Sequence, residues 1–412
     1  MRPAIVGIQR ISETAMNGPI GPIEPRQLRA LTPAASAHLD LIRGIAAWAV
    51  MWEHARALFF VSYQRLQNPT PAVKLIYFFT GFGHAAVMIF FVLSGFLISS
   101  TILGRRASGI WSWRDYAIDR SSRLYVVLIP GLLFGLLWDK VGSSLFNSTG
   151  IYSQVLDGFG LVIVRHQLTL GNFVGNLFYL QTILCPQFGS NAPLWSLANE
   201  FWYYVLFPVA LASGIAWAKK SVRSGALLTC LSLAVAIFVG REILLGFLVW
   251  LTGTTLVVAY SKWLFSEKRR LVLYLGLSSF VLIVLLTLAR IRESPWISSD
   301  FAIGFAFSAF LFGVLQLNIG TRSRSYLRTA HFLSGFSYSL YVLHFPFLLF
   351  LCAWLVPAQK WQPDPTHLVY GVALGAVALV FAWLVSKFTE DKTRVARQWM
   401  RNVIPTLDSR TG

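Results

Sequence analysis

Ten apolar runs, each near the length of a membrane span, constrain the fold of this chain more than any other feature. They lie at residues 39–60, 77–103, 121–138, 193–217, 225–240, 243–260, 271–289, 301–317, 333–357 and 367–386. A helix that crosses the hydrocarbon core of a bilayer needs about 20 predominantly apolar residues. The pattern therefore predicts an all-α fold, a polytopic membrane bundle of about ten transmembrane helices.

The composition agrees with a bundle that lipid surrounds. Of the 412 residues, 56% are hydrophobic and 13% are charged, whereas a soluble domain carries about 25% charged residues. The net charge of +18 is compatible with a nucleic-acid partner, but the positions of the charges assign it to membrane topology instead. The three cysteines are far apart and the seven histidines follow no ligand spacing. We therefore expect neither a disulfide framework nor a metal site.

Lysines and arginines alternate between the loops on the two sides of the predicted bundle. With the N-terminus inside, 25 of the 35 fall in inner segments, nine fall in outer segments, and Arg43 lies within a span. Because cytoplasmic loops are enriched in these residues, both termini are predicted to be cytoplasmic. We expect a disordered tail at 1–38, rich in Pro and Arg, a membrane domain at 39–395 and a second tail at 396–412.

The first span contains ionisable side chains that membrane helices ordinarily exclude, namely Arg43, Glu53 and His54. Arg43 and His54 lie on one helix face, because 11 positions are three turns plus about 20°, and they are roughly 16 Å apart along the axis. Arginine suits phosphate recognition and histidine suits proton abstraction near neutral pH. In the alternative interpretation, Arg43 reaches lipid headgroups and His54 hydrogen-bonds a neighbouring helix. Glu53 points about 100° away from His54 and is interpreted as a partner of Arg56 or of a neighbour.

Polar residues also interrupt the second and fourth spans. The stretch FFVLSGFLISS places Ser94 beside a glycine, a small pair typical of close helix packing. The stretch NAPLWSLANEFWYYVLFP contains Glu200, with Trp195 and Ser196 close to it in the sequence. A buried carboxylate requires a partner, so we favour a functional role for Glu200.

Two further stretches add candidate residues. The predicted inner loop contains RDYAIDRSSRLY, in which Arg120 and Arg123 either bind a phosphorylated ligand or serve as ordinary positive-inside charge. The ninth span places Tyr338, Tyr341 and His344 at i, i+3 and i+6. These three side chains form one polar stripe, which either lines a cavity or is structural.

Taken in order, these stretches resemble the motifs of the acyltransferase family 3 membrane proteins. The opening R-x10-H motif is similar to LDLIRGIAAWAVMWEH, and the later motifs are similar to FFVLSGFLIS, RDYAIDRSSRLY, NAPLWSLANEF and FSYSLYVLHFP. The closing element is similar to SKFTED, which contains Glu390. Each motif is moderately specific by itself, but their order over roughly residues 39–395 makes the resemblance strong.

The resemblance implies a cytoplasmic acyl-CoA donor and transfer of its acyl group to a hydroxyl, usually of a glycan or glycolipid. It links Arg43 to the donor and His54 to catalysis. In the mechanism that we expect, Arg120 and Arg123 help to bind the donor, and Glu200 is a second catalytic residue that orients an imidazole or the acceptor. The residues expected to line the cavity or bind the acceptor are Glu53, Ser94, Trp195, Ser196, Tyr338, Tyr341 and His344. The chain departs from the family pattern at Glu53, where an apolar residue is common, and in its sparse RSSR motif. No hydrolase-like domain follows the tenth span, so the bundle is expected to perform both binding and transfer.

The expected reaction is direct transfer from acyl-CoA, most simply acetyl-CoA, with His54 as general base and no bound cofactor. A covalent acyl-His54 intermediate is the variant of this mechanism.

The rival class is a transporter or flippase, because intramembrane ionisable residues also line translocation pathways, although no internal repeat is visible. A passive scaffold would leave the Arg43–His54 register unexplained. We expect a multi-pass protein of the bacterial inner membrane with lipid, acyl-CoA and an acceptor as partners and no nucleic acid; the acceptor stays open.

Overall fold

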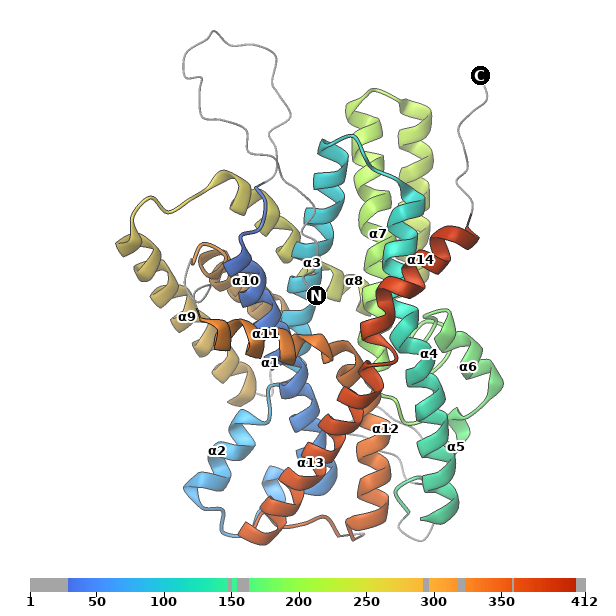
Figure 1. Cartoon of the computed structure of the whole chain (residues 1–412), viewed down its shortest axis with the longest axis vertical. Coiled ribbons are helices and arrows are strands. Elements are labelled where there is room, and N and C mark those ends of the chain that lie inside the picture. The colour runs from blue at the N-terminus through green and yellow to red at the C-terminus, as the bar shows by residue number, and fades with distance from the viewer. Residues whose placement is uncertain are drawn as a thin grey trace.

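The computed structural model describes residues 29–146, 150–153, 163–291, 296–317, 323–357 and 359–404, and within these ranges its regular elements are helices (Figure 1). The α-helices are α1 (Pro33–Phe59), α2 (Pro71–Phe79), α3 (Gly83–Ala107), α4 (Trp113–Leu145), α5 (Val164–Gln167), α6 (Leu170–Leu177), α7 (Leu194–Ala218), α8 (Val222–Lys262), α9 (Lys268–Ile291), α10 (Trp296–Val314), α11 (Arg324–Gly335), α12 (Ser337–Leu355), α13 (Pro365–Ser386) and α14 (Thr393–Val403). Two 3-10 turns, η1 (Tyr63–Arg65) and η4 (Glu390–Lys392), join them. The predicted all-α class is confirmed.

The ten predicted spans lie mainly in α1, α3, α4, α7, the two halves of α8, α9, α10, α12 and α13, but the span at 77–103 begins in α2 and the span at 333–357 begins in α11. Among the described residues, seven helical segments are long and apolar enough to cross a membrane by length and composition. The segment that contains α1 is not one of the seven; its charged residues include Arg43 and Glu53. The halves of α8 meet at a kink at Gly240, whose φ of 78° is a conformation that favours glycine. A membrane bundle is therefore confirmed, and its orientation stays a prediction.

Local capping signals fix where α1 and α13 begin. Thr32 caps α1 by accepting a hydrogen bond from the backbone N–H of Ala35 at 3.1 Å, and a proline follows the cap. The helix therefore starts inside the segment that was expected to be a disordered tail. Asp364 caps α13 in the same way, and hydrogen bonds from the backbone and ring of His367 hold the pKa of the Asp364 carboxyl below its usual range. Helix α14 likewise extends into the expected C-terminal tail.

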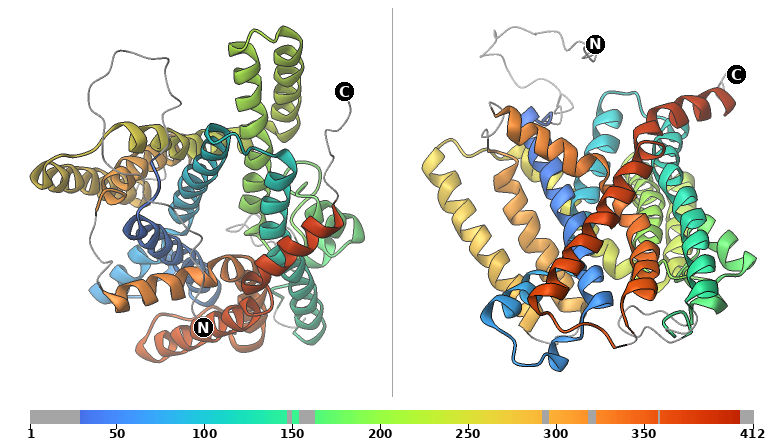
Figure 2. Two further views of the ribbon diagram at one scale, coloured as in Figure 1. Left: turned by 45° about the horizontal axis from the view of Figure 1, so that its top comes forward. Right: turned by 60° about the horizontal axis from the view of Figure 1, so that its bottom comes forward.

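The helices that carry the predicted site residues surround a common centre. Helix α1 packs against α3, α11 and α12, while α4 packs against α12, and α7 and α10 pack against α8. The left view of Figure 2 shows α1, α3, α7, α4 and α12 around this centre, with α9 at the periphery. Residues far apart in the sequence are thereby brought to the middle of the bundle.

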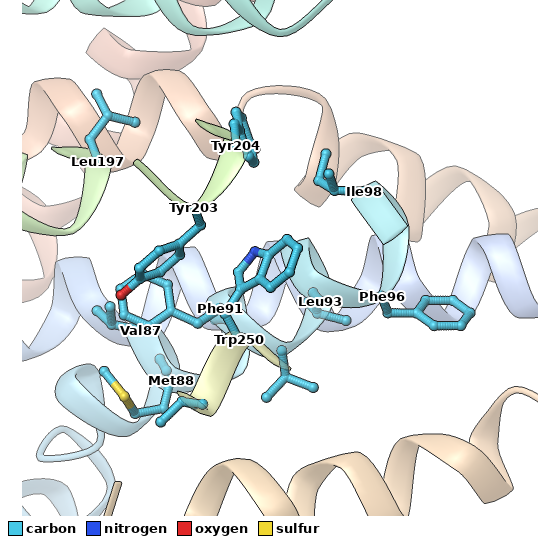
Figure 3. Close-up of a cluster of buried hydrophobic side chains, with 14 of the residues drawn as sticks. Val87, Met88, Phe91, Leu93, Phe96, Ile98, Leu197, Tyr203, Tyr204 and Trp250 are labelled. Carbon is cyan, nitrogen blue, oxygen red and sulfur yellow. The ribbon is translucent and has the colours of Figure 1, made fainter. Parts of the chain in front are cut away.

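Helices α3 and α8 approach each other at two glycines. A Cβ atom at Gly95 would lie 2.0 Å from the carbonyl oxygen of Trp250, and one at Gly253 would lie 2.0 Å from that of Val92. This close packing confirms the interpretation of the Ser94–Gly95 pair, because small residues let helix backbones come together. Figure 3 shows the aromatic core that results, in which Trp250 lies beside the side chains of α3 and α7.

Candidate active site

A cavity of about 230 Å³ occupies the centre of the bundle. Along α3 its lining runs from Val87 to Thr101, which is roughly 21 Å at 1.5 Å per residue. The predicted site residues in its wall are Arg43, Ser94, Arg120, Arg123, Ser196, Glu200, Tyr338 and Tyr341. Glu53, His54, Trp195 and His344 are not in this wall, so the structure places the predicted residues in a cavity and an adjoining layer.

Arginines from α1 and α4 give the cavity its positive charge. Arg43 donates to the Asp40 carboxylate at 2.9 Å, and the Arg123 guanidinium lies 5.2 Å from the centre of the Tyr338 ring. Within the described ranges, the Nε atoms of Arg43 and Arg120 are buried and have no hydrogen-bond partner. Buried N–H donors of this kind favour an anionic ligand such as a phosphate, because guanidinium forms charge-assisted hydrogen bonds with it.

Glu200 accepts hydrogen bonds from several helices at once. Its Oε1 atom accepts from the Ser94 hydroxyl at 3.2 Å and from the Tyr204 hydroxyl, and its Oε2 atom accepts from the Tyr338 hydroxyl. The Trp250 indole donates in turn to the Ser94 oxygen at 3.2 Å. Because both carboxylate oxygens are engaged, this geometry suits a residue that positions α3, α7 and α12 better than one that exchanges protons with a substrate.

His54 and His344 form a hydrogen-bonded pair. His54 Nδ1 lies 2.7 Å from His344 Nε2, and His344 Nδ1 lies 2.8 Å from the carbonyl oxygen of Leu340. A carbonyl only accepts, so His344 Nδ1 carries a proton, and in a neutral ring its Nε2 accepts from His54 Nδ1–H. This assignment, made from the hydrogen-bond pattern, leaves the lone pair of a neutral His54 on Nε2, as a general base requires.

Tyr341 connects the cavity with the histidine pair. Tyr341 lines the cavity, its hydroxyl lies 2.5 Å from the Ser196 hydroxyl, and its ring centre is 6.1 Å from that of His344. His54 is also about 16 Å along α1 from Arg43. The histidines therefore lie behind Tyr341, away from the arginine end of the cavity.

The remaining predicted residues, Glu53 and Trp195, lie beside the start of α3. A Cβ atom at Gly83 would be 2.1 Å from Glu53 Oε2, so this carboxylate touches the α3 backbone. The Trp195 ring is stacked on the ring of His84, with centres 6.3 Å apart. These side chains form a second polar group next to the cavity.

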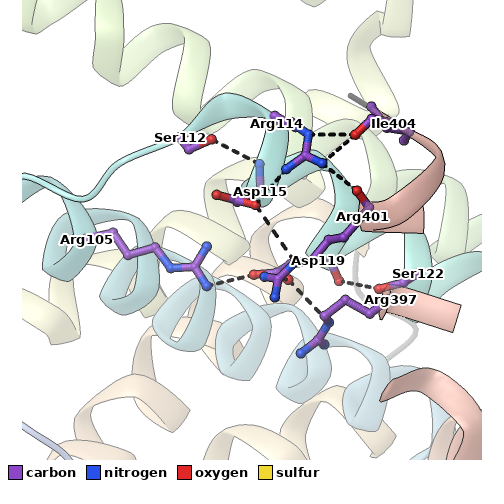
Figure 4. Close-up of polar contacts among 9 residues, drawn as sticks. All are labelled: Arg105, Ser112, Arg114, Asp115, Asp119, Ser122, Arg397, Arg401 and Ile404. Carbon is purple, nitrogen blue, oxygen red and sulfur yellow. Dashed lines mark hydrogen bonds and ion pairs between the residues drawn. The ribbon is translucent and has the colours of Figure 1, made fainter. Parts of the chain in front are cut away.

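Sequence reasoning did not find the role of Asp119. This carboxylate is 3% exposed and pairs with Arg105 at 2.7 Å, with Arg397 at 3.2 Å and with Arg401 at 3.3 Å (Figure 4). The pairs fasten α14 to α3 and α4. Arg114, which lies in the same motif as the cavity arginines, instead donates to the carbonyl oxygen of Arg401 at 2.7 Å. Acidic residues in a basic loop gave the only sequence hint of this network.

Glu390, in the closing motif, caps the start of α12. Its Oε2 atom accepts from the backbone N–H of Ser339 at 3.1 Å and from the Ser339 hydroxyl at 3.2 Å. Ser339 follows Tyr338, which contacts Glu200. Glu390 therefore fixes the helix end that presents Tyr338 to the cavity.

These features define a polytopic membrane bundle with a cationic internal cavity beside a hydrogen-bonded histidine pair, in which His344 is fully buried. Residues 36–387 match the family model described as an acyltransferase domain, and the chain belongs to this acyltransferase 3 family. The resemblance found in the sequence motifs is thereby confirmed. No solved structure matches the chain.

Curated relatives carry names that refer to O-acetyl transfer. A Staphylococcus aureus (strain MRSA252) protein named as an O-acetyltransferase is 26% identical over 359 residues, which are 78% of this chain and 55% of the relative. A Bacillus subtilis (strain 168) protein named as a peptidoglycan O-acetyltransferase is 30% identical over 167 residues, 38% of this chain and 23% of its own. The O-acetyl transferase of Shigella phage Sf6 is 24% identical over 244 residues, 56% of this chain and 65% of its own. The chain thus spans about half the length of the staphylococcal relative.

Proposed function

We propose that this protein is a membrane-bound O-acyltransferase that moves an acyl group, most simply acetyl, from acyl-CoA to a hydroxyl of a cell-surface or exported glycan or glycolipid. Membership of the acyltransferase 3 family and relatives named for O-acetyl transfer support the reaction class. A relative named for peptidoglycan supports a glycan acceptor. The observation that carries the proposal is the hydrogen-bonded chain from His54 through His344 to the Leu340 carbonyl, next to the arginine-lined cavity.

The donor enters from the arginine end of the cavity, which the charge distribution predicts to be cytoplasmic. The phosphates of CoA bind Arg43, Arg120 and Arg123, because buried guanidinium groups with spare N–H donors favour phosphate oxygens. The apolar wall, which includes Phe90 and Leu97, accommodates the uncharged arm that ends in the thioester.

The chemical step begins at His54. Its Nε2 atom removes the proton from the acceptor hydroxyl while the hydroxyl oxygen attacks the thioester carbonyl carbon. His344 stabilises the resulting imidazolium, because its Nε2 atom accepts the hydrogen bond from His54 Nδ1–H. The tetrahedral intermediate collapses as the C–S bond breaks, and the departing CoA sulfur takes the proton from His54. The Tyr341 ring lies beside His344 and its hydroxyl contacts that of Ser196, so these two hydroxyl groups are the donors to the oxyanion in this mechanism.

The test is mass spectrometry of cell-surface glycans from a deletion strain complemented with the wild-type protein, with His54→Ala or with His367→Ala. His367 is the matched control, because it lies at the start of α13 and pairs with Asp364. We expect one acyl group to disappear on deletion and to return with the wild-type protein and His367→Ala only. If every acyl group persists while the amount or location of the glycan changes, the protein is a transporter and the proposal fails.

A further inference from the structure

A histidine–aspartate pair lies at the predicted outer end of the bundle and has no part in the mechanism described above. His84, at the start of α3, has its Nε2 atom 2.9 Å and 3.0 Å from the two carboxylate oxygens of Asp300 on α10. The two side chains are 34% and 20% exposed, so a ligand can reach them.

The His84–Asp300 pair is close to the proposed reaction centre. His84 is three residues, or about one helical turn, before Val87, which lines the cavity. The Trp195 ring is stacked on the His84 ring with an angle of 19° between their planes. Trp195 also precedes Ser196, whose hydroxyl contacts Tyr341. The Trp195 indole thus links the His84–Asp300 pair to Ser196 and Tyr341, which lie beside the His54–His344 pair.

Glu53 adds a second carboxylate to the group. It contacts the backbone of Gly83, next to His84, and it precedes His54 in α1. In the part of the chain that the structure describes, Glu53 Oε2 is buried and lacks a well-aligned hydrogen-bond partner, although the Gly83 backbone N–H and the Arg56 and Arg290 guanidinium groups lie near the carboxylate. A buried carboxylate oxygen in this state favours a ligand that donates a hydrogen bond, because such an acceptor is costly to leave unsatisfied.

Two arginines lie beside this group and balance its charge. Arg56 donates to the carbonyl oxygen of Thr80, and Arg290 donates to that of Tyr77, each at 3.4 Å. Both guanidinium groups also act electrostatically on Glu53, and Arg290 Nε is buried with no hydrogen-bond partner among the described residues. Two carboxylates balanced by two arginines suit a neutral polyol, since carboxylates accept hydrogen bonds from hydroxyl groups, guanidinium groups donate to hydroxyl oxygens and an indole covers an apolar face.

We propose that Glu53, His84, Trp195 and Asp300 form the acceptor subsite and bind one sugar ring of a glycan, an assignment that rests on the proposed transfer reaction. The indole of Trp195 packs against the C–H face of the ring. The carboxylates of Asp300 and Glu53 accept hydrogen bonds from its hydroxyl groups. These contacts orient the sugar so that a neighbouring hydroxyl faces His54. Donor and acceptor then approach the histidine pair from opposite ends of the bundle.

The first test compares Asp300→Asn with Asp364→Asn, an exposed carboxylate that caps α13. The readouts are the acyl content of cell-surface glycans and the affinity of the purified protein for radiolabelled acetyl-CoA. We expect Asp300→Asn to lower glycan acylation roughly tenfold or more, because a charge-assisted hydrogen bond is lost, with acetyl-CoA affinity unchanged. Trp195→Ala should act similarly, and Trp195→Phe should restore much of the acylation. Unchanged acylation in Asp300→Asn and Trp195→Ala overturns the subsite.

The second test identifies the ligand with a photo-crosslinking amino acid placed at position 82 or at position 301 in living cells. Phe82 is two residues before His84 and is not one of the four subsite residues, so its replacement leaves Asp300 in place. Phe301 is the matched control, because it is 47% exposed and adjacent to Asp300 in the sequence. We expect hexose or hexosamine in acid hydrolysates of the position-82 adduct and lipid alone at position 301. Lipid alone at both positions overturns the subsite. If deletion of the wild-type protein leaves all glycan acyl groups in place, the transfer reaction itself fails, so the two failures are distinguishable.

Discussion

His54 and His344 are 290 positions apart in the sequence, yet their ring nitrogens are 2.7 Å apart in the folded bundle. The Leu340 carbonyl fixes the proton of His344 on Nδ1 and so directs the hydrogen bond between the rings. His344 is thus placed to orient the base and to stabilise its charged form. This arrangement makes His344 a positioning residue whose role can be separated from that of His54.

We predict that His344→Leu lowers kcat about 100-fold, the lower end of the range for general-base catalysis, while the KM for acetyl-CoA changes little. His344→Gln should retain more activity, because its side-chain oxygen can accept the hydrogen bond from His54. Steady-state kinetics of the purified protein test both expectations. A His344→Leu protein with kcat within about twofold of wild type would show that the pair has no catalytic role.

Glu200 offers a different comparison, because its carboxylate satisfies hydroxyl groups of Ser94, Tyr204 and Tyr338. Glu200→Leu leaves these hydroxyls without their acceptor, at about 1–3 kcal/mol for each group that stays unsatisfied. Glu200→Gln keeps one oxygen and should be tolerated better. We therefore expect a large fall in Tm for Glu200→Leu and a small one for Glu200→Gln, measured by thermal unfolding in detergent. A Glu200→Gln protein with wild-type Tm and no activity would instead assign a chemical role to the carboxylate.

The helices could be predicted from the sequence because hydrophobic length is a local property. The register of Arg43 and His54 could be predicted too, since helix geometry fixes it within one element. The spacing of Tyr338, Tyr341 and His344 correctly predicts that they lie on one helix. It does not predict that His344 contacts His54. That pairing depends on how α1 packs against α12, and no local pattern encodes it.

Two other features were beyond sequence reasoning for the same physical reason. Asp119 is surrounded by arginines of α3 and α14, which are far apart in the chain. Loop charges predicted topology but not these pairings. His84 and Asp300 likewise meet only when α3 packs against α10. Helix α1 begins at Pro33, within the segment predicted to be disordered, because the local Thr-Pro cap outweighs the overall composition of that segment.

The cavity arginines should control donor binding. Arg120→Gln removes a guanidinium from the cavity wall, and we expect the KM for acetyl-CoA to rise roughly 10-fold to 100-fold, because a hydrogen bond to a charged group is lost. Arg105→Gln is the matched control, since Arg105 lies near the same helix ends but pairs with Asp119. Binding of radiolabelled acetyl-CoA to the purified proteins measures the difference. Equal affinities for both variants would place the donor elsewhere.

Asp119 should hold α14 in place, because its carboxylate pairs with Arg397 and Arg401 (Figure 4). Asp119→Asn removes the negative charge that these guanidinium groups share, so α14 should detach more often and its arginines should become accessible to trypsin. We expect faster tryptic cleavage within Thr393–Val403 than in the wild-type protein, followed by mass spectrometry of the released peptides. Asp115→Asn is the control, because Asp115 is 40% exposed and its pair with Arg401 is longer, at 3.8 Å. Equal cleavage rates in the two variants would mean that the remaining contacts of α14 with α4, such as those of Arg114, are sufficient to hold the helix.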